Sequence, residues 1–443
     1  MFAGWNREVA LTEMLDARER RAAAQGEMLR AFGLPLVSFT LNIPGPVKDG
    51  ALVRAAFREG KRQIEATLLA EQIDVAHRQE SCAATGCEAL YAVRADALRV
   101  KRAMRAVEER CEIGRYFDID VIGTDGAKTS RAQVGAPERR CFLCGKPAAE
   151  CARSRAHSVP ELQAHVFSAL NEYLDDRFAD WAAEKAVLAL LYEVAVTPKP
   201  GLVDRANSGA HTDMDFFTFQ RSAAALTAYF RRCALSGLRG EALDAAERFE
   251  TTRNLGTLAE RDMLCATGGV NTHKGAVFSM GTLCAAAGFL RQTRETFDAA
   301  ALCGEAAAMV HGACEAFAKT HGGKLYGARL EAARGFETVR QIALPALKAA
   351  LAQGKSVNDA GVETLLVLLC RAEDTNLIRR GGADAPQRLR ARVLARREAG
   401  ENALDAANAL DAECIAENLS PGGCADLLAL AFFFLFLEEG AEN

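Results

Sequence analysis

The chain has 443 residues, of which half are hydrophobic and a quarter are charged, and its formal net charge is −4. This length predicts two or three domains, and the composition is that of an ordinary globular protein. Neither half carries the strong positive balance of a nucleic-acid-binding protein, so no nucleic-acid partner is expected.

The first residues, Met1–Glu8, contain no basic segment followed by an apolar run, and we therefore expect no secretion signal. The most apolar run, Leu427–Leu437, is too short to cross a bilayer and predicts a buried helix. The fourteen cysteines are scattered, which indicates that most of them are buried thiols in a reducing compartment. The expectation is a cytoplasmic protein with no membrane partner.

Residues 1–175 are expected to form an α+β domain, because alternating apolar and polar residues predict strands between helical segments. The predicted strands are Leu36–Ile43, a segment near Ala89–Arg94, and Tyr116–Ile122, and the clearest predicted helix is Leu98–Arg110.

Two aspartates on the third predicted strand, Asp118 and Asp120, are two residues apart and therefore project from the same face. Adjacent carboxylates repel each other, and a divalent cation is the usual reason for such a pair. Mg²⁺ fits, with triphosphate oxygens completing its octahedron. Lys48 and Arg115 would offset further phosphate charge. A strand with a solvated polar face is the alternative, but the apolar flanking residues favour a buried strand and a metal site.

A cluster downstream has the residue types of a Cys₃His zinc site, namely Cys141, Cys144, Cys151 and His157. Only one C-x-x-C pair is present, so buried thiols are the preferred interpretation over Zn²⁺.

Several segments of the first domain match one family in chain order. They are Leu36–Thr40 with Pro44–Lys48, Gly114–Val121, Ser130 with Arg131, and Arg140–Cys144 with Cys151–Arg153 and His157. These segments resemble the apo-citrate lyase phosphoribosyl-dephospho-CoA transferase family across nearly all of residues 7–160. The resemblance implies a nucleotidyltransferase-like domain that moves a phosphoribosyl-dephospho-CoA group from its triphosphate precursor to a serine of the acyl carrier (gamma) subunit of citrate lyase, releasing pyrophosphate. It places the family's paired aspartates at Asp118 and Asp120, and Arg131 among the phosphate-binding residues.

Residues 176–443 are expected to form an all-α domain, because the segment is rich in alanine and almost lacks strand signals. The predicted helices are Trp181–Val194, Phe216–Leu235, Lys274–Leu290, Val362–Ala372 and Ala403–Asn418. Ser420 and Pro421 fit the N-cap and first position of a last helix.

Dense polar clusters lie at the junctions between these helices. The first is extended, because each proline of Thr197–Asp204 biases its predecessor away from helix. It carries Lys199, Asp204, Asn207, His211 and Asp213. Functional groups concentrate in such loops, although a loop merely capped by Asp and Asn is the alternative.

Two further clusters contain groups suited to phosphate. Asn271, His273 and Lys274 stand where the chain enters a glycine-punctuated helix, whose backbone amides would attract phosphate, and Asp262 precedes them. A structural histidine is the alternative for His273. The last cluster carries Asp374, Asn376 and Arg380, whereas Ser420–Gly423, ahead of Asp426, is interpreted as capping and turn chemistry.

Five ordered motifs of the second half match another family. They are Thr197–Asp204, Gly209–Met214, Gly269–Gly275, Asp374–Asn376 with Arg380–Gly382, and Asn418–Gly423. They resemble the triphosphoribosyl-dephospho-CoA synthase family over roughly residues 185–435. Leu330 departs from the family, which usually has glycine there, and this puts a close backbone approach to ligand in doubt.

The resemblance implies that ATP and dephospho-CoA are joined and adenine is expelled, with the triphosphate retained. The transfer needs a base for the 2′-hydroxyl, an acid for the departing adenine, and Mg²⁺ with cations to hold the triphosphate. We expect Asp204 and Asp213 to bind Mg²⁺ and triphosphate together with Lys199 and Lys274. The candidate bases are His211 and Asp262, and His273 is the candidate acid.

The two resemblances together predict a bifunctional transferase, in which the product of the second half is the substrate of the first. The alternatives are a Mg²⁺-dependent ribosyl hydrolase, a carrier-binding maturation factor with one inactive half, and the equivalent maturation protein for malonate decarboxylase.

Overall fold

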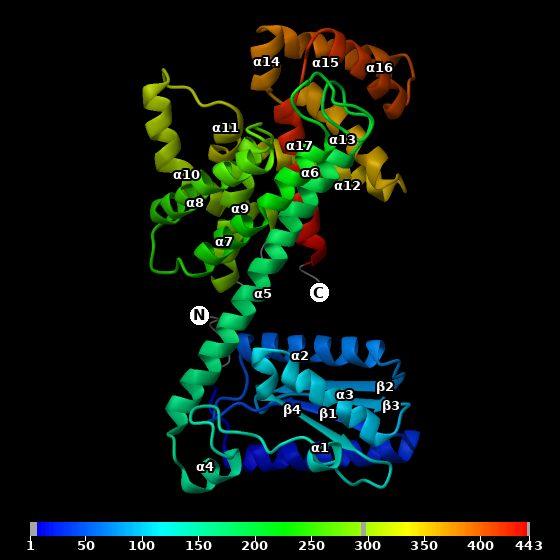
Figure 1. The fold of residues 1–443 in the computed structure, drawn as a ribbon, viewed down its shortest axis with the longest axis vertical. Helices are drawn as coiled ribbons and strands as arrows, with labels where there is room; N and C mark the ends of the chain where they lie inside the picture. The colour runs from blue at the N-terminus through cyan, green and yellow to red at the C-terminus, as the bar shows by residue number, and fades with distance from the viewer. Residues whose placement is uncertain (1–6, 294–297, 441–443) are drawn as a thin grey trace. The chain divides into compact units, whose positions relative to one another are not determined.

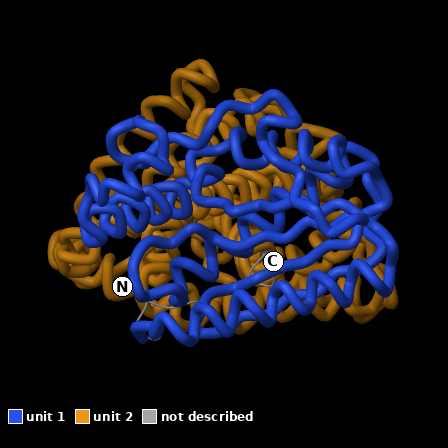
Figure 2. Tube along the Cα trace, turned by 90° about the horizontal axis from the view of Figure 1, so that it is seen from below, with its two compact units in different colours: residues 1–176 blue, residues 177–443 orange. Residues whose placement is uncertain are grey.

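The computed structural model describes residues 7–293 and 298–440 (Figure 1). Most of the segment Met1–Glu8, on which the expectation about secretion rests, lies outside these residues. The chain divides into two compact units, residues 1–176 and 177–443 (Figure 2). A single long helix, α5 (Val159–Ala195), begins in the first unit and ends in the second.

The first unit is built on a four-stranded antiparallel sheet with the strand order β2-β3-β1-β4. The strands are β1 (Leu36–Leu41), β2 (Val75–Ala83), β3 (Gly86–Val93) and β4 (Phe117–Ile122). The three predicted strands are confirmed. The strand β2 was not predicted, because its residues are mostly polar and exposed and do not alternate. Its Cys82 forms a disulfide with Cys87 on β3, so these two cysteines are exceptions to the thiols expected for most of the fourteen.

Helices cover both faces of this sheet (Figure 1). They are α1 (Leu11–Phe32) on one face and α2 (Ala51–Ala70) and α3 (Ala97–Arg110) on the other. The larger core lies between the sheet and the pair α2 and α3, where Phe39, Phe57 and Phe117 pack together. A smaller core, with Met28 and Leu90, lies under α1. The remaining short elements are the 3₁₀ helices Glu112–Tyr116 and Ala132–Val134 and the helix α4 (Ala148–Ser154).

The register of the sheet aligns polar side chains across three strands. Thr40 of the central strand β1 is paired with Glu88 on β3 and with Asp118 on the edge strand β4. The prediction that β4 is buried holds for one face only. Phe117 and Ile119 are buried, whereas the Asp118 side chain, on the opposite face, is 51% exposed.

The described part of the second unit contains helices and no strand. They are α6 (Phe216–Ala225), α7 (Thr227–Leu238), α8 (Ala245–Ala266), α9 (Lys274–Thr293), α10 (Ala299–Thr320), α11 (Gly327–Ala333), the π-helical turn Val339–Ala343, α12 (Leu344–Ala352), α13 (Val357–Arg371), α14 (Thr375–Gly381), α15 (Ala385–Glu398), α16 (Ala403–Ala416) and α17 (Gly422–Gly440). The helix predicted over Phe216–Leu235 is interrupted at Leu226. Helix α17 begins at Gly422, one residue later than an N-cap at Ser420 would place it.

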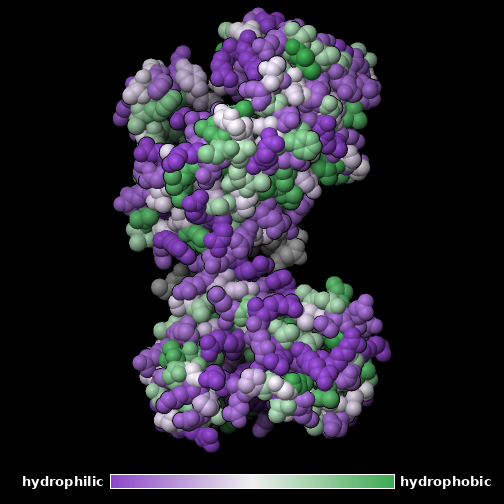
Figure 3. All heavy atoms as spheres, in the orientation of Figure 1, coloured by the Kyte–Doolittle hydropathy of each residue, from purple (hydrophilic) through white to green (hydrophobic). Residues whose placement is uncertain are grey.

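Helix α17 forms the centre of this unit and packs against α9, α12, α13 and α14. Its apolar run, with Phe432, Phe433 and Phe434 almost fully buried, confirms the predicted buried helix. Among the described residues, no helix is both long and apolar enough to cross a membrane. On the face shown in Figure 3, hydrophobic residues are interspersed with hydrophilic ones.

Candidate active sites

A cavity of about 510 Å³ in the second unit brings together segments from all five motifs of that half. Its lining includes Lys199, His211, Asp213, Asn271, His273, Lys274, Asn376, Arg379, Arg380 and Ser420. These residues lie far apart in the sequence, and all except Ser420 come from segments for which the sequence predicted a functional role. Ser420 was interpreted as capping chemistry, but it lines the cavity.

The cavity is suited to an anion. The first residues of two long helices line it, Lys274 and Gly275 at the start of α9 and Gly422 and Gly423 at the start of α17. Helix N-termini present unpaired backbone amides and a partial positive charge. Lys274, whose amine lies 2.9 Å from Glu260, and the arginines of α14 add full positive charges.

His211 is held by its neighbours on both ring nitrogens. Its Nε2 lies 2.8 Å from the Ser420 hydroxyl, and its Nδ1 lies 3.2 Å from the Arg380 guanidinium. Burial, followed by the charge of Arg380, lowers the pKa of His211, although Asp213 opposes this. His211 is therefore a neutral imidazole at the cavity wall. The side chain of Asp213, 62% exposed, leaves its carboxylate available to the cavity.

His273 is buried, and its Nδ1 lies 2.7 Å from the Ser222 hydroxyl. Thr272 donates to the same hydroxyl at 2.7 Å, so the Ser222 proton is free to point to Nδ1, which leaves the ring proton on Nε2. Nε2 is buried without a hydrogen-bond partner. Burial lowers the pKa of His273 to about 3, so the ring is neutral and suited to donating a hydrogen bond rather than a proton.

Two acids line the cavity, the buried Glu193 and the partly exposed Asp426. Glu193 and Lys199 form an ion pair whose two side chains are at most 5% exposed. Asp426, on the first turns of α17, lies against Gly275, where an added Cβ would be only 2.0 Å from its Oδ2. Burial raises the pKa of Asp426 to about 8, with further contributions from Glu193 and Asp374. Asp426 therefore carries a proton at neutral pH.

Several predicted residues do not line this cavity. Both carboxylate oxygens of Asp204 accept backbone amides, from Lys199 at 2.9 Å and from Ala206 at 2.7 Å. Asn207 donates to Asp411 at 2.8 Å and supports the same loop. Asp374 is buried, caps α14 and also accepts the Cys424 amide at 2.9 Å. These three residues shape the loops that carry the cavity.

Two further positions bear on the sequence expectations. Asp262 is exposed on α8 and is not part of the cavity lining. Leu330 lies within α11, where Gly327 and Ala328, rather than Leu330, line the cavity. The departure from the family at position 330 therefore leaves the backbone approach at Gly327 in place.

In the first unit, Asp118 lines a smaller cavity of about 150 Å³ between the sheet and α1. The cations in its lining are Lys48, Arg18 and Arg21, and the other acid is Glu88. Burial and the nearby Arg18 lower the pKa of Lys48, and burial raises the pKa of Glu88. Glu88 is brought to the cavity by its pairing with Thr40 across the sheet, and the sequence alone does not give this pairing.

The other charged residues predicted for this site make contacts with the loop that follows β4, or within it. Asp120 pairs with Lys128 at 2.5 Å, and Arg139 approaches Asp118 at 3.5 Å. Arg131 and Arg139 both bind the buried Glu108. Arg115 is exposed, donates to the Cys141 carbonyl at 3.2 Å and lies outside the small cavity. Arg115 and Arg131 are thus not among the residues that line the small cavity with Lys48 and Asp118.

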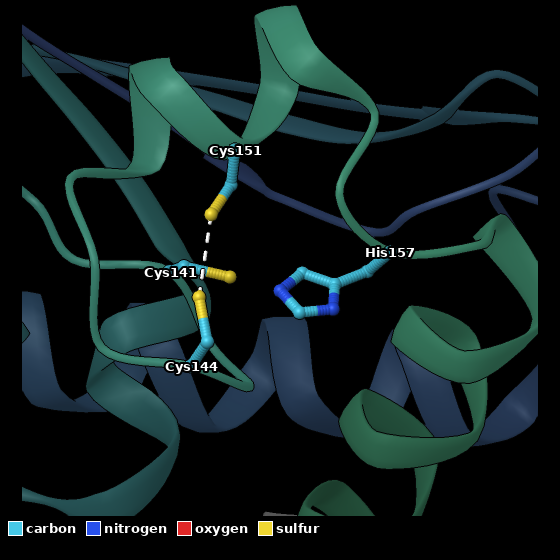
Figure 4. A group of neighbouring side chains, drawn as sticks. All are labelled: Cys141, Cys144, Cys151 and His157. Carbon is cyan, nitrogen blue, oxygen red and sulfur yellow. Dashed lines mark hydrogen bonds between the residues drawn. The ribbon is translucent and has the colours of Figure 1, made fainter.

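The four predicted zinc-ligand types lie together (Figure 4). Their candidate ligand atoms are all within 4.8 Å of one another. Cys141 and Cys151 are buried, but Cys144 is exposed, so the interpretation as buried thiols does not hold for Cys144.

Comparison with known proteins assigns each half of the chain to a protein family. Residues 179–443 match the family described as ATP:dephospho-CoA triphosphoribosyl transferase, and residues 9–173 match the family described as apo-citrate lyase phosphoribosyl-dephospho-CoA transferase. Protein CitXG of Haemophilus influenzae is 33% identical, over 98% of this chain and 97% of that protein. The chain belongs to this family of fused transferases.

A second relative spans nearly the whole chain, and another matches just over half of it. Protein CitXG of Leuconostoc mesenteroides is 31% identical over 98% of both chains. A 2-(5''-triphosphoribosyl)-3'-dephosphocoenzyme-A synthase of Pectobacterium atrosepticum is 44% identical over 56% of this chain and 86% of that protein. The predicted fusion is confirmed. The fused transferase combines synthesis of the citrate lyase prosthetic group with its attachment.

Sequence reasoning missed three acids in the fused transferase. Glu193 lies in the apolar last turns of α5, Asp426 lies in the apolar α17, and Glu88 lies on a strand away from any recognised motif. An acid within an apolar helix is a signal that would have found the first two, because such a residue is rarely buried without a reason.

Proposed function

We propose that the cavity of the second unit binds ATP and dephospho-CoA and that its own side chains carry the transfer. The supporting observation is the convergence of all five motifs, two helix N-termini and four cations on one cavity. The triphosphate lies against the starts of α9 and α17, where Lys274 and Arg379 offset its charge.

The roles of general base and general acid are assigned from the surroundings of His211 and Asp426. His211, neutral and half-buried, takes the proton of the 2′-hydroxyl of dephospho-CoA on Nδ1, in place of the hydrogen bond that Nδ1 accepts from Arg380. As the bond from the anomeric carbon to adenine breaks and the bond to the 2′-oxygen forms, Asp426 gives its proton to the departing adenine. An acid with a pKa near the working pH is suited to this step. His273 donates a hydrogen bond from Nε2 and acts neither as the general base nor as the general acid.

Mg²⁺ fits this cavity through Asp213, which exposes its carboxylate, together with oxygens of the triphosphate. Asp204 does not fit, because backbone amides already occupy both of its oxygens. When bound, the ion neutralises triphosphate charge. Lys199 remains tied to Glu193 and keeps the wall of the cavity ordered.

In the first unit we propose a nucleotidyltransferase-like site on the α1 face of the sheet. Asp118 and Asp120 share this face of β4 and are suited to holding Mg²⁺ on the triphosphate of the precursor. Lys48, Arg18 and Arg21 face the same small cavity and offset phosphate charge. The acceptor is a serine of the acyl carrier (gamma) subunit of citrate lyase, and pyrophosphate leaves.

The experiment uses the full chain with Mg²⁺, ATP, dephospho-CoA and apo carrier protein, and follows adenine by chromatography and the carrier by mass spectrometry. Asp426→Asn should lower adenine release by roughly 100-fold or more and still attach preformed precursor. Asp118→Asn should release adenine normally and leave the carrier unmodified. Equal loss of both steps in either variant would contradict the division of labour.

Matched controls remove a carboxylate outside the cavities. Glu439→Gln lies on the same helix as Asp426, and Asp16→Asn lies on α1, and both side chains are exposed. Each control should keep both steps. Adenine release from ATP without dephospho-CoA would instead support a ribosyl hydrolase.

A further inference from the structure

The segment between β4 and α5, residues 123–158, has almost no core of its own. It contains one three-residue 3₁₀ turn and the seven-residue helix α4. Of its residues only Cys141 and Cys151 are buried. A segment of this length cannot be ordered by burying two cysteines, because each ordered residue costs about 1–2 kcal/mol of backbone entropy.

A hairpin, the short helix α4 and the residue before the cap of α5 bring four side chains of this segment together (Figure 4). Cys141 and Cys144 lie on a tight hairpin, in which the Cys141 amide donates to the Lys146 carbonyl at 2.7 Å and Gly145 has a φ of +70°. Cys151 projects from α4, and His157 immediately precedes the cap of α5. The Sγ atoms of Cys144 and Cys151 are 3.3 Å apart.

The spacing of the four ligand atoms fits one tetrahedral ion. Bonds of about 2.3 Å from zinc to sulfur place the ligand atoms of a tetrahedron about 3.8 Å apart, and all four atoms here lie within 4.8 Å of one another. The Nε2 atom of His157 is buried and has no hydrogen-bond partner. Its ring faces the three sulfur atoms (Figure 4). A buried polar atom left unpaired is costly, and a metal bond would satisfy it.

We propose that Cys141, Cys144, Cys151 and His157 bind one structural Zn²⁺ ion. Three thiolates and an imidazole are ligands that select zinc over Mg²⁺ or Ca²⁺, and four protein ligands leave no open position for catalysis. The thiol protons pass to solvent on binding, and no electron is transferred.

The ion fixes the loop that reaches β4. Arg139, two residues before Cys141, contacts the Phe117 carbonyl at 3.0 Å and approaches Asp118 at 3.5 Å. Arg115 donates to the Cys141 carbonyl itself. Zinc therefore positions arginine side chains beside the strand that carries the aspartate pair, without touching the reacting groups.

The direct test is the metal content of the full chain, purified anaerobically with a phosphine reductant after growth with zinc, and measured by plasma mass spectrometry. About one zinc per chain is expected, and Cys144→Ser should fall below about a tenth of that. The matched control is Cys265→Ser, which also removes an exposed free thiol, on α8, and should keep its zinc. His157→Cys should retain zinc, whereas His157→Ala should lose it.

Two further readouts do not depend on the variants folding. Replacing zinc by Co²⁺ in the wild-type chain should give the intense ligand-field bands of a tetrahedral thiolate site. A chelator should make the peptide bonds of residues 123–158 more sensitive to protease. A wild-type chain that holds no zinc after anaerobic reconstitution, or one whose Cys144 and Cys151 are joined as a disulfide in place of a metal, overturns the proposal.

Discussion

The raised pKa of Asp426 leads to a prediction about stability that can be tested without substrate. Its pKa is raised from 3.8 to about 8 by burial, then by Glu193 and Asp374. Between these two values the folded chain holds a proton that the unfolded chain has released, so the free energy of unfolding falls as the pH rises. An asparagine has the same shape as the neutral acid and removes the titration. Wild type and Asp426→Asn should therefore diverge with pH, the wild type becoming relatively less stable.

The size of the divergence follows from the proton linkage. One pKa unit corresponds to about 1.4 kcal/mol, and integration from pH 6 to pH 8 gives roughly 2 kcal/mol. The other titrating groups are common to both proteins, so the difference between the two isolates Asp426. Above about pH 8 the difference should become constant, because the folded carboxyl has then lost its proton as well.

Urea titrations at several pH values measure this difference. The chain has two tryptophans, Trp5 and Trp181. A Trp5→Phe background leaves Trp181, which belongs to the second unit and packs against its core, as the fluorescent reporter. A difference between the two proteins that stays constant within about 0.5 kcal/mol from pH 6 to pH 8 would mean that Asp426 titrates normally, and its role as the acid would be wrong.

Three other outcomes are expected. Gly275→Ala should abolish adenine release, because its Cβ would lie 2.0 Å from the Asp426 carboxylate, whereas Gly304→Ala, in open space on α10, should leave adenine release intact and stabilise the helix by about 1 kcal/mol in urea titrations. Lys199→Met should lower the free energy of unfolding by about 3–5 kcal/mol, because it leaves Glu193 buried and unpaired, and adding Glu193→Gln should recover part of this loss. His211→Asn should slow adenine release by roughly 100-fold, while Asp262→Asn should not. The opposite ranking in a kinetic assay would mean that Asp262, and not His211, is the general base.

The sequence predicts the loops of the second site well and the roles within them less well. Asp and Asn in a loop either cap backbone amides or face a ligand, and both uses favour the same residue types. Asp204 and Asp374 turned out to bind amides, whereas Asp213, a few residues from Asp204, faces the cavity. The distinction depends on where the chain folds back, which no local pattern contains.

The strands of the first unit follow from alternation, but their alignment does not. Asp118 and Asp120 could be placed on one face from their spacing alone. That Glu88 lies in the same row, across Thr40, depends on the pairing of β1 with two strands that come later in the chain. Long-range pairing of this kind sets the composition of the site and has no short-range signal in the sequence.

The glycines of the second site are explained by the same long-range packing. An added Cβ at Gly275 would meet Asp426, at Gly422 it would come within 2.8 Å of the Asn376 amide, and at Gly423 within 2.9 Å of Asp374. The starts of α9 and α17 can therefore approach the polar groups of the cavity only because side chains are missing there. This close approach brings the first residues of two helices to the one cavity in which we propose that the triphosphate binds, while an acid protonated at neutral pH lines the same cavity. A site that must hold a polyphosphate and protonate a leaving base needs both features within one ligand's length, and glycine at these positions provides the room.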